Sequence, residues 1–210
     1  MLSYPIRKLV AAGIEEILVV TGTEHMGDVV GFLGSGRDFG CAFTYRVQDK
    51  AGGIAEALGL ARGFAGGDRI CVVLGDNIFE DDLIHCVERF REQNRGARLL
   101  LKQVDDPSRF GVAEIRGDHI VGIEEKPAKP RSDLCVTGVY MYDEQVFEII
   151  AGLRPSERGE LEITDVNSVY LERGELEFDR LQGWWTDAGT FESLARAQEL
   201  VRQWKEIKGL

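Results

Sequence analysis

Long apolar stretches are missing from this sequence of 210 residues. A helix that crosses a membrane needs about 20 consecutive apolar residues, and no such run occurs. The N-terminal residues also lack the charged start, apolar centre and small-residue cleavage site of a secretory signal peptide. We therefore expect a cytoplasmic protein without a membrane partner.

Cysteine and histidine are both scarce, with 4 and 3 residues respectively. The cysteines are scattered and form no C-x-x-C pair, which argues against a zinc site and against a disulfide framework. The histidines lie far apart in the sequence, and no nucleophile has a base beside it, so covalent catalysis has little support. These residues are Cys41, Cys71, Cys86, Cys135, His25, His85 and His119.

Positive charge is also in short supply. Asp and Glu number 36 against 25 Lys and Arg, which gives a net charge of −11 and a pI of about 4.8. An acidic protein repels a phosphate backbone, so no nucleic-acid partner is expected. A small phosphorylated ligand is compatible with this balance, because salt screens distant charges and a few nearby cations then dominate.

Apolar residues make up 44% of the chain, and their spacing predicts an α/β fold. Up to Asn94, helical and strand patterns alternate, which is typical of a parallel sheet covered by helices. Beyond Asn94 the strands are joined by short turns, as in an antiparallel insertion. We expect residues 1–210 to form a single domain with a mixed, mostly parallel sheet flanked by helices. The expected strands are 16–20, 41–46, 70–74, 97–103, 112–115, 119–124, 134–142 and 175–181, and the expected helices are 1–12, 24–33, 54–61, 81–90, 143–150, 161–173 and one from 190 onward.

The strand at 70–74 is followed by Gly75 and Asp76. It is wholly apolar, which predicts burial on both faces of a parallel sheet. Ligands of such sheets collect beyond the carboxyl ends of the strands, where Asp76 would lie. Asp187 has an equivalent place before a glycine turn, and one or two carboxylates together with substrate phosphates are typical ligands of Mg²⁺. The alternative is that either aspartate caps a helix or closes a turn.

Other polar clusters could bind a phosphorylated ligand. Residues 47–53 contain Gln48, whose amide could read the edge of a base, and two glycines that would let a ligand approach the backbone. Residues 124–127 place two carboxylates beside Lys126, a combination suited to sugar hydroxyls and a phosphate. Arg158 could bind a phosphate through two hydrogen bonds. The alternative for each cluster is a tight turn or a solvated surface charge.

Taken in order, these motifs resemble those of the sugar-1-phosphate nucleotidyltransferase family, with its glucose-1-phosphate thymidylyltransferase branch as the nearest match. The resemblance covers nearly the whole chain. It implies a Rossmann-like fold, a homo-oligomer, and transfer of a nucleotidyl group from a nucleoside triphosphate to a sugar 1-phosphate with Mg²⁺ and release of pyrophosphate. In the nearest branch the group is dTMP and the sugar is glucose. The segments that carry the resemblance are Gly75–Phe79, Phe110–Val112, Glu124–Pro127, Val136–Tyr140, Arg158–Asp165 and Asp187–Thr190.

The resemblance also implies a role for individual residues. Catalysis would depend on two aspartates that hold Mg²⁺ and on two cations that bind the sugar phosphate. The family's tyrosine before the glycine is Phe110 here, which removes a hydroxyl group from that contact. The implied residues are Asp76 and Asp187 for the metal, Lys126 and Arg158 for the sugar phosphate, Gln48 and Gly53 for the base, Gly111, Glu125 and Val136 for the sugar, and Trp185 beside the two cations.

The family pattern also has an N-terminal strand and a glycine-rich triphosphate loop that these 210 residues do not contain. In the family that strand lies between the strands matching 16–20 and 70–74, so both should have an unpaired edge here. Three explanations are open: the native chain begins earlier, the sheet closes by another route, or a partner chain supplies the edge, and we favour the first. The alternative function is a non-catalytic nucleotide-sugar binding or regulatory domain, and we expect pyrophosphate release only from a version extended upstream.

Overall fold

A long strand, β8, lies at the centre of the structure, which is a computed structural model that describes residues 1–208. The strands are β1 (Glu16–Gly22), β2 (Ala42–Gln48), β3 (Ile70–Val73), β4 (Asn77–Phe79), β5 (Ala97–Gln103), β6 (Gly111–Arg116), β7 (His119–Glu125), β8 (Leu134–Tyr142), β9 (Leu176–Arg180) and β10 (Trp185–Asp187). The α-helices are α1 (Ser3–Ala11), α2 (Met26–Leu33), α3 (Ile54–Gly59), α4 (Arg62–Ala65), α5 (Ile84–Glu92), α6 (Val146–Gly152), α7 (Ile163–Glu172) and α8 (Phe191–Lys208).

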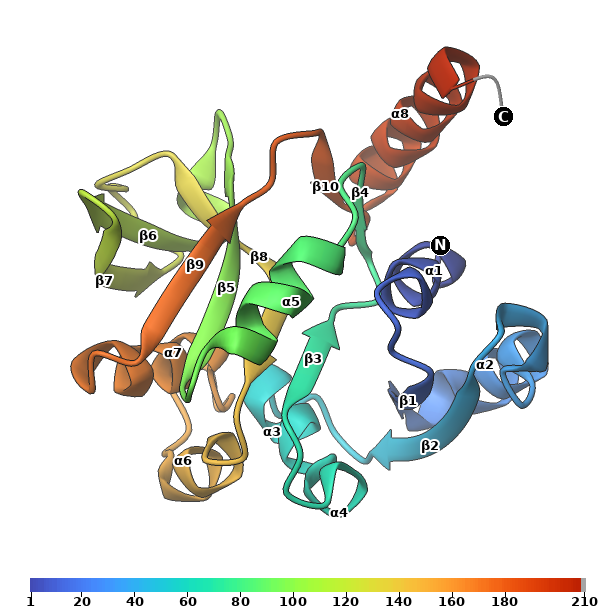
Figure 1. Cartoon of the computed structure of the whole chain (residues 1–210), viewed down its shortest axis with the longest axis horizontal. Helices are drawn as coiled ribbons and strands as arrows, with labels where there is room; N and C mark the ends of the chain where they lie inside the picture. Colours follow the sequence, from blue (N-terminus) through green and yellow to red (C-terminus); the bar gives the residue numbers. More distant parts are fainter. Residues whose placement is uncertain (209–210) are drawn as a thin grey trace.

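The larger sheet has the order β7-β6-β8-β5-β9, with β3 paired to β8 as well. One edge of β8 pairs with β5, and its other edge pairs with β3 near one end and with β6 near the other. Every residue of β8 except Leu134 is buried, because strands lie on both sides of it and helices cover both faces (Figure 1). The larger sheet therefore provides the rigid frame of the molecule.

Side chains of the central strands alternate between two apolar clusters, as the two-residue repeat of a strand requires. Leu99 and Tyr140 face the cluster formed with α3, α6 and α7. Leu100 and Val139 face the opposite cluster, formed with α1 and α5. Tyr142 stacks on Tyr140 and on a tyrosine of α7, which extends the first cluster into an aromatic column. Helices therefore cover both faces, as expected for an α/β fold.

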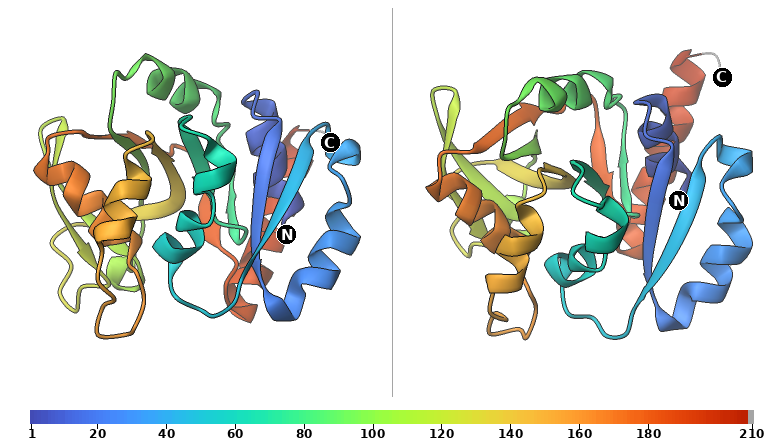
Figure 2. Two further views of the ribbon diagram at one scale, coloured as in Figure 1. Left: turned by 90° about the horizontal axis from the view of Figure 1, so that it is seen from below. Right: turned by 60° about the horizontal axis from the view of Figure 1, so that its bottom comes forward.

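The strands β1 and β2 form a separate parallel pair, with α2 packed beside them (Figure 2). Among residues 1–208, β1 pairs only with β2, and β3 pairs only with β8. An apolar groove of about 450 Å³ lies between the facing edges of β1 and β3 and is lined as well by α1 and α3. The expected unpaired edges are thus present, and the described chain does not close the sheet by another route.

Several expectations need correction. β3 is not parallel to its neighbour, since it runs antiparallel to β8, and most pairings in the larger sheet are antiparallel, with β5–β9 the parallel exception. All residues of β3 are half-buried rather than buried, because one edge of the strand faces the groove. The helix expected at 54–61 is divided into α3 and α4, and the short strand β4 was not predicted. The α/β class with a mixed sheet flanked by helices is confirmed.

None of the helices described for residues 1–208 is long and apolar enough to cross a membrane.

Candidate active site

A cavity of about 260 Å³ opens at one end of the larger sheet, between β8 and β10. Its wall is assembled from segments that are far apart in the sequence, namely the ends of β3 and β7, the start of β6, and the loop before α7. Most of the residues singled out from the sequence lie together in it. Those that line the cavity are Asp76, Gly111, Glu125, Lys126, Val136, Arg158, Trp185 and Asp187.

The two aspartates converge through the pairing of β4 with β10. In this antiparallel pair Asn77 lies opposite Asp187, and the N–H of Ala188 donates to the carbonyl of Asp76 at 2.8 Å. A Cβ atom at Gly189 would lie 3.2 Å from Asp76 Oδ2 and 3.7 Å from Asp187 Oδ2. Both carboxylates therefore point to the same small space.

Few side chains beside the two aspartates could coordinate a metal ion. Within residues 1–208, no group of three or more His, Cys, Asp or Glu side chains is arranged to hold a metal ion. Two carboxylates with room beside them nevertheless suit Mg²⁺, which keeps several waters and takes its remaining ligands from substrate phosphates. Arg109 reaches the same place from the other side, with Nη2 3.3 Å from Asp187 Oδ2.

Asn77 holds the aspartate edge together, and sequence reasoning missed it. Its Oδ1 accepts hydrogen bonds from Trp185 Nε1 at 2.8 Å and from the Gly138 N–H at 2.9 Å. Its Nδ2 donates to Asp76 Oδ1 at 2.9 Å. Asn77 is only 3% exposed, so no water could take the place of its side chain as the hydrogen-bond partner of these groups. The signal in the sequence was the amide directly after Asp76.

The two cations share an acidic neighbour, Glu125. Its Oε1 lies 3.8 Å from Lys126 Nζ and 3.7 Å from Arg158 Nη2. Arg158 also lies 2.8 Å from Glu162 and 3.5 Å from Glu160. The cations are partly neutralised in this arrangement, and a phosphate entering the cavity would compete with these carboxylates for them.

Two features orient these charged side chains. Burial alone would raise the pKa of Glu162, but hydrogen bonds from Ser156 and Arg158 outweigh it and leave the pKa below its usual value. Glu162 therefore stays ionised and fixes Arg158. Lys126 has a φ of 44°, in the left-handed region that residues other than glycine rarely adopt. This conformation lets its N–H continue the β6–β7 pairing by donating to Phe110 at 3.0 Å.

Val136, Gly111 and Trp185 form part of the apolar wall of the cavity. A Cβ atom at Gly111 would lie 3.3 Å from Thr164 Oγ1, so a side chain there would narrow the space. Trp185 is 9% exposed and packs edge-on against Phe110, with ring centroids 5.3 Å apart. Trp185 is thus a packing residue as well as part of the wall.

Gln48 and Gly53 do not line this cavity, but they lie next to it through the loop before α3. Gly53 has a φ of 97°, and a Cβ atom there would lie 2.5 Å from the carbonyl oxygen of Leu161. The Gly52 carbonyl accepts from the Leu161 N–H at 2.8 Å, and Ala55 N–H donates back to Leu161 at 3.2 Å. These bonds join the glycine loop to the segment that carries Arg158.

The sequence matches one family of known proteins. The family model described as nucleotidyl transferase matches residues 1–203. This chain belongs to the nucleotidyl transferase family. The enzymes of this family are nucleotidyltransferases, and the nucleotidyltransferase fold identified from the motifs is confirmed.

Individual relatives agree with this assignment. A glucose-1-phosphate thymidylyltransferase from Neisseria meningitidis serogroup A is 42% identical over 214 residues, covering 100% of this chain and 74% of the relative. One from Neisseria gonorrhoeae is 40% identical with the same coverage. Both relatives are named for transfer of a thymidylyl group to glucose 1-phosphate.

Solved structures show the same fold. A candidate glucose-1-phosphate thymidylyltransferase from Bacillus anthracis in complex with sucrose has a TM-score of 0.92 and 58% identity, covering 96% of this chain and 82% of that one. A UDP-glucose pyrophosphorylase complexed with UDP-glucose has a TM-score of 0.84 at 21% identity, covering 96% and 86%. The second similarity shows the fold alone.

Proposed function

We propose that this nucleotidyltransferase transfers dTMP from dTTP to glucose 1-phosphate and releases pyrophosphate. The observation that carries the proposal is that one cavity brings together two carboxylates, Asp76 and Asp187, and two cations, Lys126 and Arg158. The names of relatives at 40–42% identity support the choice of thymidylyl group and of glucose.

In the proposed reaction a phosphate oxygen of the sugar 1-phosphate attacks the α-phosphorus of the triphosphate in line. A new P–O bond forms there, and the bond between the α-phosphorus and the bridging oxygen breaks, so pyrophosphate leaves with the bond's electron pair. Such transfers depend on positioning and charge neutralisation more than on an acid or base of the protein. This agrees with a cavity whose charged side chains form ion pairs, such as Glu125 with Lys126 and with Arg158.

The named residues divide this work. Lys126 and Arg158 would bind the sugar phosphate in place of Glu125, which would then be free to accept from sugar hydroxyls. Asp76 and Asp187 would hold Mg²⁺, which neutralises phosphate charge when bound. Gly111 and Val136 would leave room for the sugar ring, and Trp185 would wall the cavity.

Gln48 and Gly53 would contact the base, on the side of the cavity joined to Leu161. A base placed there would lie across the glycine loop from the sugar-phosphate segment. The same hydrogen bonds that join Gly52 to Leu161 would then keep the two substrates in a fixed relation.

The test is pyrophosphate release from dTTP and glucose 1-phosphate with Mg²⁺. It is measured for the 210-residue chain and for a version that carries the glycine-rich triphosphate loop at its N-terminus. We expect release from the extended version and binding of dTDP-glucose by both. Binding by both without release from either would instead favour a nucleotide-sugar binding or regulatory domain.

Asp187→Asn in the active version tests the metal assignment. We expect turnover to fall by at least about 100-fold, with a change in unfolding free energy below about 1 kcal/mol. Asp28→Asn, an exposed position in α2, is the matched control and should change neither. An equal loss of stability and turnover would indicate that Asp187 has a structural role and does not hold the metal.

A further inference from the structure

Glu56 has no role in the site described above, yet its carboxylate is the nearest charged partner of Gln48. Gln48 Nε2 donates to Glu56 Oε1 at 3.0 Å and to the Gly53 carbonyl at 3.3 Å. Both neighbours are acceptors only, since a carboxylate and a carbonyl carry no proton to donate. The nitrogen of the Gln48 amide must therefore face them, and its oxygen must face away.

The glycine at 52 allows this contact. A Cβ atom at Gly52 would collide with the carboxylate of Glu56, so the side chain of Glu56 folds back over a bare α-carbon. Gly52 itself is fixed by its hydrogen bond from Leu161. Glu56 is half-buried in the first turn of α3, so its position is set by the helix and the loop together.

We propose that Glu56 is a positioning residue that locks the Gln48 amide with Oε1 as the group presented to the base. The proposal rests on the proposed function, in which Gln48 contacts the base. An amide oxygen that is held in one orientation distinguishes bases by whether the ring nitrogen facing it carries a proton. Uracil and thymine carry an N–H at N3 that can donate to it, whereas cytosine has a lone pair at N3 that repels it.

Cytosine could reach the same oxygen with its amino group only from a shifted position. Such a shift would move the attached ribose and phosphates away from the cations on the other side of the Gly52–Leu161 junction. Among the pyrimidine nucleotides, the expected substrates are therefore those of uracil and thymine. The amide alone does not separate these two, because both have the same N3 edge.

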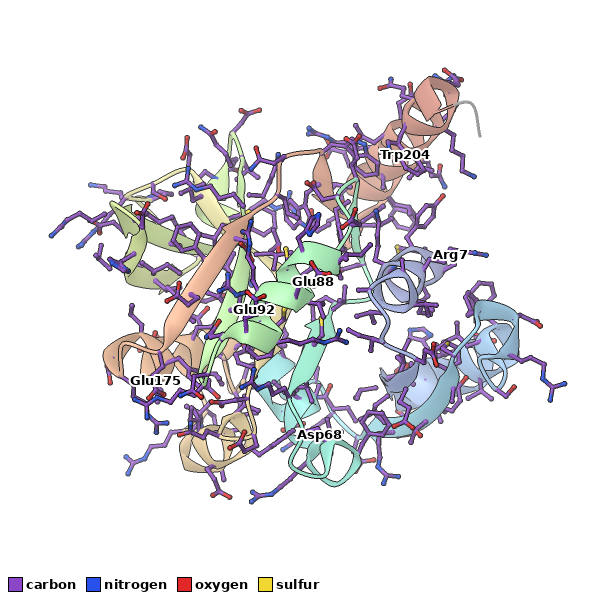
Figure 3. All side chains as sticks on the ribbon, viewed as in Figure 1. Arg7, Asp68, Glu88, Glu92, Glu175 and Trp204 are labelled. Carbon is purple, nitrogen blue, oxygen red and sulfur yellow. The ribbon has the colours of Figure 1, made fainter. Side chains whose placement is uncertain are left out.

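Glu56→Gln tests this proposal, because it removes the charge of Glu56 while the volume of the side chain stays nearly unchanged. The new amide can accept from Gln48 Nε2 or donate to Gln48 Oε1, so both orientations of Gln48 become available. Glu92→Gln, on the exposed side of α5 (Figure 3), makes the same charge change away from the cavity and is the control.

The first measurement needs no nucleotide. In ¹H–¹⁵N NMR spectra of the 210-residue chain, the Gln48 side-chain amide protons should exchange slowly with solvent. In Glu56→Gln we expect that exchange to accelerate about tenfold or more, as loss of a charge-assisted hydrogen bond predicts. Unchanged exchange would overturn the positioning role.

The second measurement is the affinity for UDP-glucose relative to CDP-glucose by calorimetry. We expect the native chain to favour UDP-glucose by at least about 100-fold, and Glu56→Gln to bring the two within roughly tenfold. An equal loss of affinity for both, or an unchanged ratio, would show that Glu56 does not set base choice. If neither ligand binds and dTDP-glucose does not bind either, the proposed function fails, and the exchange measurement still decides whether Glu56 positions the amide.

Discussion

The strands β5 and β1 are each 7 residues long and carry similar apolar runs, but they are buried to different extents. In β5 the first five residues are buried, whereas in β1 only Ile17 is. Within the part of the chain that the structure describes, β5 has a strand on each side, β8 and β9, while β1 pairs with β2 alone and faces the groove on its other edge. Burial of an apolar strand is thus decided by its neighbours. The carboxylates and cations of the site line the cavity at one end of the larger sheet, which contains β5. Gln48 is the last residue of β2, the strand that pairs with β1.

The largest test of this difference is a matched pair of core truncations. Leu99→Ala in β5 removes a side chain that is 0% exposed and should cost about 4 kcal/mol of unfolding free energy. Leu18→Ala in β1 removes a half-buried side chain at the groove and should cost no more than about 2 kcal/mol. Denaturant titration measures both. Equal losses would mean that β1 is as well packed as β5.

A second test addresses the buried hydrogen bonds through which Asn77 joins the β4–β10 pair to β8. Asn77→Ala would leave the donors of Trp185 and Gly138 unsatisfied, and we expect a loss of about 3 kcal/mol. The control is Asn94→Ala, which is exposed and should stay within about 0.5 kcal/mol. A loss below about 1 kcal/mol for Asn77→Ala would show that water replaces the amide.

Alkaline pH should weaken the larger sheet through its tyrosine column. Burial raises the pKa of Tyr142 and of Tyr170 well above the usual value. The folded state then retains phenol protons that the unfolded state loses, so this contribution to stability is complete below about pH 10 and falls above it. Each such tyrosine contributes a slope of up to about 1.4 kcal/mol per pH unit.

Tyr142→Phe sharpens the alkaline test, because it removes one phenol from the column. The slope of unfolding free energy against pH should then decrease by the contribution of one titrating proton. Unfolding free energies measured between about pH 10 and 11 would give the slopes. The same slope in both proteins would assign the alkaline loss to other groups.

The smallest effect should be confined to the β1–β2 pair. An edge-on aromatic chain runs from Phe32 through Phe39 to Phe43, with centroids 6.3 and 5.8 Å apart. Phe39→Leu keeps an apolar side chain but removes these ring contacts, and should cost about 1 kcal/mol. Hydrogen exchange should accelerate for amides of β1 and β2 and stay unchanged in β5. Faster exchange in β5 as well would show that the two regions open together.

Much of the site could be predicted from the sequence, because its residues lie at the ends of short apolar runs. Asp76 comes shortly after β3, and Asp187 ends β10, so local pattern alone placed each near a strand end. The same holds for Lys126 after β7. Asn77 and Glu56 were missed, since their importance lies in partners that only the fold brings near, Gly138 in one case and the Gln48 amide nitrogen in the other.

By itself the sequence determined the alternation of helix and strand, the acidic balance and the order of the family motifs. The tertiary structure decided the rest: that β3 runs antiparallel to β8, that two distant carboxylates face one small space, and that one apolar strand is buried while another is half-exposed. The reason is that hydrophobic spacing and turn residues act over a few neighbours along the chain. Strand pairing, burial and hydrogen-bond partners depend on which segments meet in space, and no local pattern specifies that.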